Sequence, residues 1–327
     1  MNYLSSEKKL QTSWKLTTKA LPRGAKKPGL YRNRMYPFCL PLEYAAHNLF
    51  HEIRDDAIET FRCHDIVWHT SALPGLPSNH LCSSQVFAVN LLYPFIDKPE
   101  ALADALRPFF PDIKQMLPVE DKRFIAFEWI GDINYLNEEP KIGDSRKRGA
   151  GNTSIDAMLM YETADSKKVM LLIEAKYSES YGATYKRFRS DGTDRIRNYE
   201  GFFKSPFSPI NHDIAPNLAD FLYEPFYQLL RHSLLASQIL KTGKPKVNKV
   251  LVVHLAVNKN KDLLAVTSPR FRHIGKTTYE VWKKLLKDPS TFSLISIEDF
   301  FKGINLETHR ELEPWALFMK NRYSFFR

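Results

Sequence analysis

The chain lacks the features of secreted, membrane-spanning and disulfide-stabilised proteins. Its 327 residues include only three cysteines, Cys39, Cys63 and Cys82, an odd and widely spaced set that does not suit a disulfide framework. The longest apolar runs, VMLLI and VLVVHLAV, are far shorter than the ~18–20 residues of a membrane-spanning helix. The N-terminal MNYLSSEKKLQTSWK lacks the apolar centre of a secretory signal. These absences favour a cytoplasmic protein with no membrane partner.

Negative charge is also in short supply. The chain has 37 acidic residues against 47 Lys and Arg, which gives a formal net charge of +10. A basic surface attracts polyanions, so nucleic acid is the first candidate partner and an acidic membrane surface the second. The hydrophobic fraction of 43% and the charged fraction of 26% are ordinary for a globular protein and exclude general disorder.

The pattern of apolar residues predicts an α/β protein with a helical N-terminal region. Residues 1–40 are basic and interrupted by Pro and Gly, which predicts an arm with little core of its own. Helical spacing follows, and then three predicted strands, a long helix and a further strand. The predicted helices cover 41–61, 83–93, 99–110 and 218–240, and the predicted strands lie within 123–130, 153–180 and 246–257. This order predicts a mixed sheet flanked by helices.

The stretch TSIDAMLMYETADSKKVMLLIEAKYSES carries the most chemistry, because it reads as two apolar strands with charged residues near their ends. If its turn centres on Asp165, antiparallel pairing places Asp156 opposite Glu174. Side chains alternate along a strand, so Glu174 and Lys176 point to the same face. Two facing carboxylates repel each other unless they share a proton or bind a divalent cation, for which their oxygen atoms are natural ligands.

A lysine beside such a cation would orient a water and balance the charge of a phosphate, a set suited to metal-assisted phosphodiester hydrolysis. The alternative is that the three charged residues mark strand ends that meet solvent.

Asp156 followed by IEAK, with Glu174 and Lys176, resembles the motif of the PD-(D/E)xK nuclease superfamily, and the predicted element order resembles its core. Longer blocks between residues 36 and 240 resemble a bacterial family of restriction endonucleases. These blocks are YPFCLPLEYAAHNLFHEIRDDAI, WHTSALPGLPSNHLCSSQVFAVNLLYPF, RGAGNTSIDAML, IEAKYSESY and EPFYQLLRHSLLA. The superfamily's usual Pro is replaced by Ile155, and Gln85 stands where many members carry an acid on the first core helix.

The resemblance implies a restriction-endonuclease-like core that cleaves double-stranded DNA with Mg²⁺, for which Mn²⁺ can substitute. It implies Asp156 and Glu174 as metal ligands and Lys176 beside the attacking water. We expect residues 1–80 to form a basic arm and helical region packed on a nuclease domain of residues 81–327, which carries C-terminal additions. A homodimer would suit a palindromic target. A repair or recombination nuclease and a non-catalytic DNA-binding module are the alternatives.

Four further polar residues accompany the acid–lysine set. Gln85 is a candidate catalytic residue that would hydrogen-bond a water or a phosphate; satisfaction by backbone is the alternative. Glu128, inside the strand of 123–130, faces either the site or solvent. Glu138 and Glu139 lie in a polar loop and are expected to be solvated.

Two basic segments flank the acid–lysine set and are candidates for gripping DNA, since Lys and Arg neutralise phosphates and aromatic rings stack on bases. They contribute Arg146, Lys147, Arg148, Lys186, Arg187, Arg189, Arg195 and Arg197. Gln228 and Arg231 are three residues apart on one helix face and could also hold a phosphate. Solvated loops are the ordinary alternative. The basic residues of the N-terminal arm, Lys26, Lys27, Arg32 and Arg34, could enter a minor groove, or the arm could be disordered.

Histidines and cysteines between His47 and Cys82 raise the question of zinc, but their spacings match no common zinc module.

Overall fold

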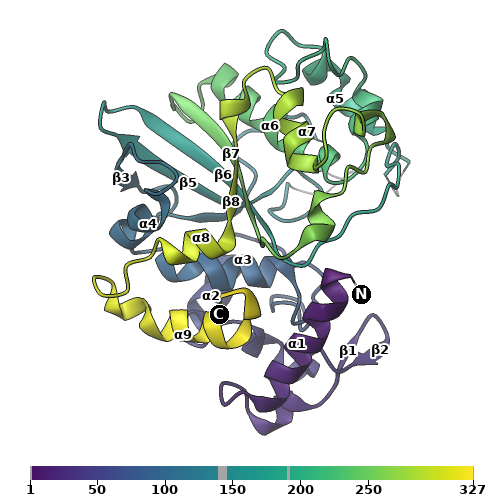
Figure 1. Cartoon of the computed structure of the whole chain (residues 1–327). Coiled ribbons are helices and arrows are strands. Elements are labelled where there is room, and N and C mark those ends of the chain that lie inside the picture. Colours follow the sequence, from purple (N-terminus) through teal and green to yellow (C-terminus); the bar gives the residue numbers. More distant parts are fainter. Residues whose placement is uncertain (1, 139–145, 190–191, 327) are drawn as a thin grey trace.

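A mixed β-sheet lies at the centre of the computed structural model (Figure 1). The structure describes residues 2–138, 146–189 and 192–326. Six strands of this part form the sheet: β3 (Ile113–Leu117), β4 (Ala126–Trp129), β5 (Ile155–Thr163), β6 (Lys168–Lys176), β7 (Lys249–Ala256) and β8 (Phe292–Ser296). The order is β3-β5-β6-β7-β8, and β4 also pairs with β5. Pairing is antiparallel from β3 and β4 to β6 and parallel from β6 to β8, which confirms the mixed α/β class.

The central hairpin has the predicted register. Ala157 pairs with Ile173 and Met160 pairs with Met170, so the next position along the two strands places Asp156 opposite Glu174. Every residue of β6 after Lys168 is buried, because β5 and β7 flank it and helices cover both faces of the sheet.

Two hydrophobic cores lie on the two faces of the sheet. One packs odd-numbered side chains of the central strands, such as Leu171 and Val253, against α3 (Ser84–Leu92), α4 (Pro99–Leu106), α8 (Ile297–Lys302) and α9 (Glu313–Arg322). The other packs even-numbered side chains, such as Leu172 and Val252, against α5 (Arg195–Phe203), α6 (Phe226–Thr242) and α7 (Thr278–Leu285) (Figure 1). The parity of residues 156, 174 and 176 therefore assigns them to the α6 face.

The N-terminal region contains a helix that the sequence did not predict. Helix α1 (Tyr3–Thr17) packs on the body, and a small cluster of Trp14, Leu21, Ala25 and Leu40 closes with Leu81. Helix α1 was not predicted from the sequence because its buried face includes Glu7, Gln11 and Lys15, polar residues that erase the hydrophobic periodicity. Their partners lie far along the chain: Tyr177 Oη donates to Glu7 at 2.7 Å, and Gln11 Nε2 donates to Tyr177 Oη at 3.1 Å.

Two predicted helices are interrupted. Residues 41–61 form the short helix η2 (Leu42–Asn48) and α2 (Arg54–Cys63), and residues 218–240 form η4 (Leu218–Phe221) and α6. Pro225 lies at the second break, where its missing N–H and the constraint on its predecessor end a helix.

The strands β1 (Gly29–Tyr31) and β2 (Arg34–Tyr36) make a separate hairpin beside α1 (Figure 1). Strand β3 lies outside the strands predicted from sequence. Cys39, Cys63 and Cys82 are free thiols. Among the helices of the described residues, none is long and apolar enough to cross a membrane.

Candidate active site

A polar cavity of about 340 Å³ opens where β5 begins and β6 ends, between the start of α3 and the start of α6. We call it the acid–lysine cavity. The candidate residues from the sequence that line it are Gln85, Glu128, Asp156, Glu174, Lys176, Lys186, Gln228 and Arg231. These residues come from β4, β5, β6, α3, α6 and the loop after β6 that carries Lys186.

Glu174, Lys176 and Gln228 form a closed triangle of hydrogen bonds. Lys176 Nζ lies 2.7 Å from Glu174 Oε1 and 2.6 Å from Gln228 Oε1, and Gln228 Nε2 donates to Glu174 Oε1 at 2.7 Å. The side chains of Glu174 and Lys176 are only 7% and 3% exposed. Burial opposes the charge of Lys176, but the attraction of Glu174 and other nearby acids outweighs it and holds the pKa of Lys176 well above its usual range. The lysine is therefore a protonated donor.

Asp156 is the uncompensated acid of the cavity. Its Oδ2 accepts a hydrogen bond from the backbone N–H of Ala175 at 2.8 Å. Burial, followed by repulsion from Glu174 and Glu128, raises the pKa of Asp156 well above its usual range, and Lys176 and the Ala175 bond offset this only in part.

Glu128 adds a third carboxylate, and the choice between cavity and solvent is settled in favour of the cavity. Its side chain is 3% exposed. Gln85 Nε2 and Ser154 Oγ each donate to it at 2.7 Å. The backbone at Glu128 has a positive φ of 46°, uncommon for a residue other than glycine, and the β4–β5 ladder skips this position between Phe127 and Trp129. This local kink turns the carboxylate inward, and only its apolar neighbours hinted at its burial.

Gln85 spans the gap between α3, β4 and the preceding loop. Besides its bond to Glu128, its Nε2 donates to Val67 O at 3.0 Å, and its Oε1 accepts from the His69 N–H at 2.7 Å. The residue lies in the cavity wall, where it orients Glu128.

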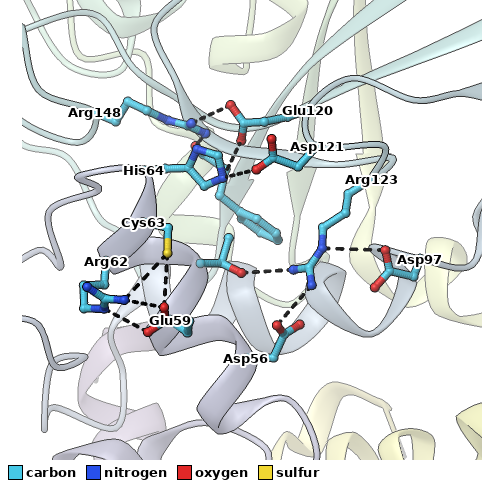
Figure 2. Close-up of polar contacts among 12 residues, drawn as sticks. Asp56, Glu59, Arg62, Cys63, His64, Asp97, Glu120, Asp121, Arg123 and Arg148 are labelled. Carbon is cyan, nitrogen blue, oxygen red and sulfur yellow. Dashed lines mark hydrogen bonds and ion pairs between the residues drawn. The ribbon is translucent and has the colours of Figure 1, made fainter.

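Arg148 holds the end of β4 from behind the cavity. Its Nη1 lies 2.7 Å from Glu120 Oε1, its Nη2 donates to Phe127 O, and its Nε donates to Glu128 O at 3.4 Å. Figure 2 shows Glu120 in contact with both Arg148 and His64, and the His64 ring lies 3.7 Å from Glu120. The side chain of Arg148 is 12% exposed, so its guanidinium is engaged within the protein.

The other basic residues of the two segments differ in how far they are exposed and engaged by other protein groups. Arg146 donates to Ile130 O at 2.8 Å, whereas Lys147 is 47% exposed beside Asp65. In the second segment, Lys186 lies 3.3 Å from Glu224 and Arg187 lies 3.0 Å from Asp194. Arg195 lies over the Tyr227 ring at 5.2 Å, Arg189 is half-buried before α5, and Arg197 is exposed on α5. Arg231, on α6, lies over the same Tyr227 ring at 4.8 Å.

Glu138 corrects the expectation of a solvated loop. It is 7% exposed, and it accepts from the Thr153 N–H, from Thr153 Oγ1 and from Tyr199 Oη. It thereby fixes the chain just before β5. Glu139 lies outside the described residues.

The donor set of the acid–lysine cavity suits a hard divalent cation, because Asp156 and Glu174 present carboxylate oxygens whose mutual repulsion a cation would relieve. Within residues 2–138, 146–189 and 192–326, no three acidic, histidine or cysteine side chains are gathered as ligands of one metal ion. That finding includes the histidines and cysteines between His47 and Cys82. Asp156 and Glu174, with Glu128 near Asp156 on the neighbouring strand, are therefore the carboxylates that the sheet offers to this cavity.

Fold and site together define a mixed α/β protein whose central hairpin carries two acids and a lysine into a polar cavity. The chain belongs to the family described as Restriction Endonuclease associating with ARP, whose sequence model matches residues 8–324. The match spans nearly the whole chain and includes every residue of the cavity. The family is one of restriction endonucleases, which implies DNA as the substrate. No curated protein and no solved structure matches the chain.

Proposed function

We propose that the chain is a metal-dependent DNA endonuclease of restriction type, built on a PD-(D/E)xK core. The observation that carries the proposal is the placement of Asp156, Glu174 and Lys176 in one cavity, with the two acids opposite each other and the lysine beside them. Family membership and the net charge of +10 support DNA as the substrate.

Asp156 and Glu174 would hold Mg²⁺, or Mn²⁺ in its place. A bound divalent cation supplies charge stabilisation to a phosphate and lowers the pKa of a water. Lys176 is protonated, so its part is to donate: it orients a water and stabilises negative charge that develops on the phosphate. Gln228 keeps Lys176 and Glu174 in place through its two side-chain bonds.

The rim of the cavity supplies phosphate contacts. Lys186 and Arg231 line it directly, and Arg187 and Arg197 lie exposed on the adjoining segment. We propose these four as contacts to double-stranded DNA. Three other guanidinium groups donate hydrogen bonds to backbone carbonyls, those of Arg146, Arg148 and Arg195. Their part in DNA binding is therefore chiefly to hold the loops that form the rim.

The test is a cleavage assay on plasmid and phage DNA with Mg²⁺ or EDTA, using wild type, Asp156→Asn and Lys176→Met. Lys167→Met is the matched control, because Lys167 lies at the exposed turn of the same hairpin. We expect discrete Mg²⁺-dependent fragments from wild type and the control and none from the two cavity variants. Wild type that binds DNA and leaves it intact with every divalent metal would favour a non-catalytic DNA-binding module.

A further inference from the structure

A second cavity of about 440 Å³ adjoins the acid–lysine cavity. We call it the side cavity. The two share His69, Ser84, Gln85, Glu179 and Tyr181, so they adjoin at the first turn of α3. Its volume lies within the range of about 300–1,000 Å³ that small-ligand sites occupy.

Aromatic rings form the outer wall of the side cavity. Tyr31, the last residue of β1, lies with its ring centroid 4.9 Å from that of His80, and Phe38 supports His80 from behind at 5.0 Å. Tyr181 contributes a further ring from the segment after β6. Flat rings at the edge of a polar cavity are the usual platform on which nucleobases stack.

Among the polar groups that line the side cavity, Glu179 supplies an acceptor and His80 a donor. Glu179 Oε2 is buried and has no hydrogen-bond partner among the residues that the structure describes, so it is an acceptor in need of a donor. His80 Nδ1 accepts the Cys82 N–H at 3.1 Å, which leaves its proton on Nε2. Burial, aided by nearby Lys8 and Arg32, lowers the pKa of His80 to about 4, so this ring is a neutral donor at pH 7.

The walls of the side cavity are fixed by contacts from distant segments. Asn260 Nδ2 donates to Tyr177 O at 3.2 Å and to Glu179 O at 2.9 Å, and Ser178 Oγ donates to Cys82 O at 3.0 Å. These bonds hold the segment that follows β6 against the start of α3. A site with fixed walls loses little entropy when it binds a ligand.

The β1–β2 hairpin carries exposed cations next to this cavity. Tyr31 pairs with Arg34, so Arg32 and Asn33 form a two-residue turn, and both have positive φ, 46° and 63°. The Arg32 guanidinium lies over the Tyr31 ring at 5.4 Å, and Asn79 Nδ2 anchors Leu30 O at 2.9 Å. The hairpin is thus held with Arg32 and Arg34 exposed, placed to contact phosphates of a strand that enters the side cavity.

We propose that the side cavity binds one nucleotide of the DNA substrate, next to the phosphate that the acid–lysine cavity cleaves. Its base stacks on Tyr31 and Tyr181, and an exocyclic amino group donates to Glu179. The cavity therefore favours adenine, cytosine or guanine over thymine. This inference deepens the proposed function and rests on it.

The experiment is a binding selection from a duplex DNA library with a randomised centre, performed in EDTA so that no cutting occurs. Wild type, Glu179→Gln, Tyr31→Ala and Tyr31→Phe are compared, and Tyr36→Ala serves as a control because Tyr36 lies on the paired strand outside the cavity wall. The thermal unfolding midpoint of each variant reports whether it is folded.

We expect wild type to disfavour thymine at one position. Glu179→Gln should reduce that discrimination about tenfold, since a base hydrogen bond and its discrimination have this order of size. Tyr31→Ala should weaken DNA binding about tenfold, and Tyr31→Phe, which keeps the ring, should restore it. Tyr36→Ala should leave the base preference unchanged.

Folded Glu179→Gln and Tyr31→Ala variants whose binding and base preference match those of wild type would overturn the inference, as would wild type that binds no duplex. The proposed function is judged separately, by cleavage in Mg²⁺. The protein could show a base preference that depends on Glu179 and yet never cut DNA. That result would support the nucleotide site in the side cavity and refute the proposed nuclease function.

Discussion

Replacing Asp156 by Asn should stabilise the metal-free protein while abolishing cleavage. The Asp156 carboxylate faces Glu174 and lies near Glu128, and only the Ala175 N–H and Lys176 compensate its charge. Ionisation of Asp156 therefore lowers the stability of the folded state, whereas the unfolded chain can ionise this group without that cost. Asn keeps the shape, and its side-chain carbonyl can still accept the Ala175 bond, but it carries no charge.

The sign and size of the effect follow from linkage. The folded-state pKa of Asp156 lies above the unfolded value of about 3.9, and each unit of difference costs the folded state about 1.4 kcal/mol once the group is ionised. Asp156 is half-buried, so solvent screens part of the repulsion, and we expect a gain of about 1–2 kcal/mol at pH 7. The gain in unfolding free energy should vanish as the pH falls below about 4, because Asp156 of wild type is then protonated in both the folded and the unfolded state.

Magnesium should stabilise wild type more than Asp156→Asn and so offset the higher stability of the variant. A cation that binds only the folded state with a dissociation constant of about 1 mM stabilises it by about 1.4 kcal/mol at 10 mM. Wild type should gain this amount, and Asp156→Asn, which has lost a ligand, should gain less. Urea unfolding in EDTA and in 10 mM Mg²⁺ measures both effects.

Asp165→Asn is the control for this experiment. Asp165 lies in the exposed turn of the same hairpin, and hydrogen bonds from Lys167 and Thr163 lower its pKa, so its replacement should bring no gain and no Mg²⁺ response. An Asp156→Asn protein that is less stable than wild type by more than about 1 kcal/mol in EDTA would refute the reasoning, since the buried carboxylate would then be a net stabiliser.

Three further outcomes are expected. Lys176→Met should cost about 3–5 kcal/mol in urea unfolding because it leaves Glu174 buried and unpaired, and adding Glu174→Gln should recover most of the loss; a simple sum of the two costs would contradict the pairing. Arg148→Lys should lower the cleavage rate about tenfold and lower the unfolding free energy by about 1–3 kcal/mol, because lysine cannot hold Glu120 and two β4 carbonyls at once; unchanged cleavage would show that Arg148 does not position Glu128. Arg322→Met should cost about 3–5 kcal/mol by the same unfolding assay, since Asn48 O and Leu81 O would lose a buried charged donor, and a cost below 1 kcal/mol would contradict this role.

The hairpin that carries the acids could be predicted from sequence because its geometry is local. A polar turn between two apolar runs fixes the register, and the alternation of side chains then fixes which residues share a face. The placement of Asp156 opposite Glu174 follows from these two rules, and so does the common face of Glu174 and Lys176. The fold class follows equally from the order of apolar runs.

The N-terminal helix could not be predicted in this way. Its buried face includes polar side chains, and they are satisfied by partners far along the chain: Gln11 bonds Tyr177 Oη and Arg322 O, and Lys15 Nζ donates to Cys39 O. Hydrophobic periodicity reports burial only where burial is apolar. A buried polar face becomes visible once its partners are in place.

Sequence by itself thus determined the α/β class, the basic character and the acid–lysine hairpin, since each depends on composition or on neighbours along one strand. Tertiary structure alone decided how the other site residues are partnered. Glu128 turns inward because a kink in β4 brings it to Gln85, 43 residues away, and Arg148 turns inward because Glu120 and the β4 carbonyls satisfy its guanidinium. A buried charge needs a partner, and which partner it finds is decided only when distant segments pack together.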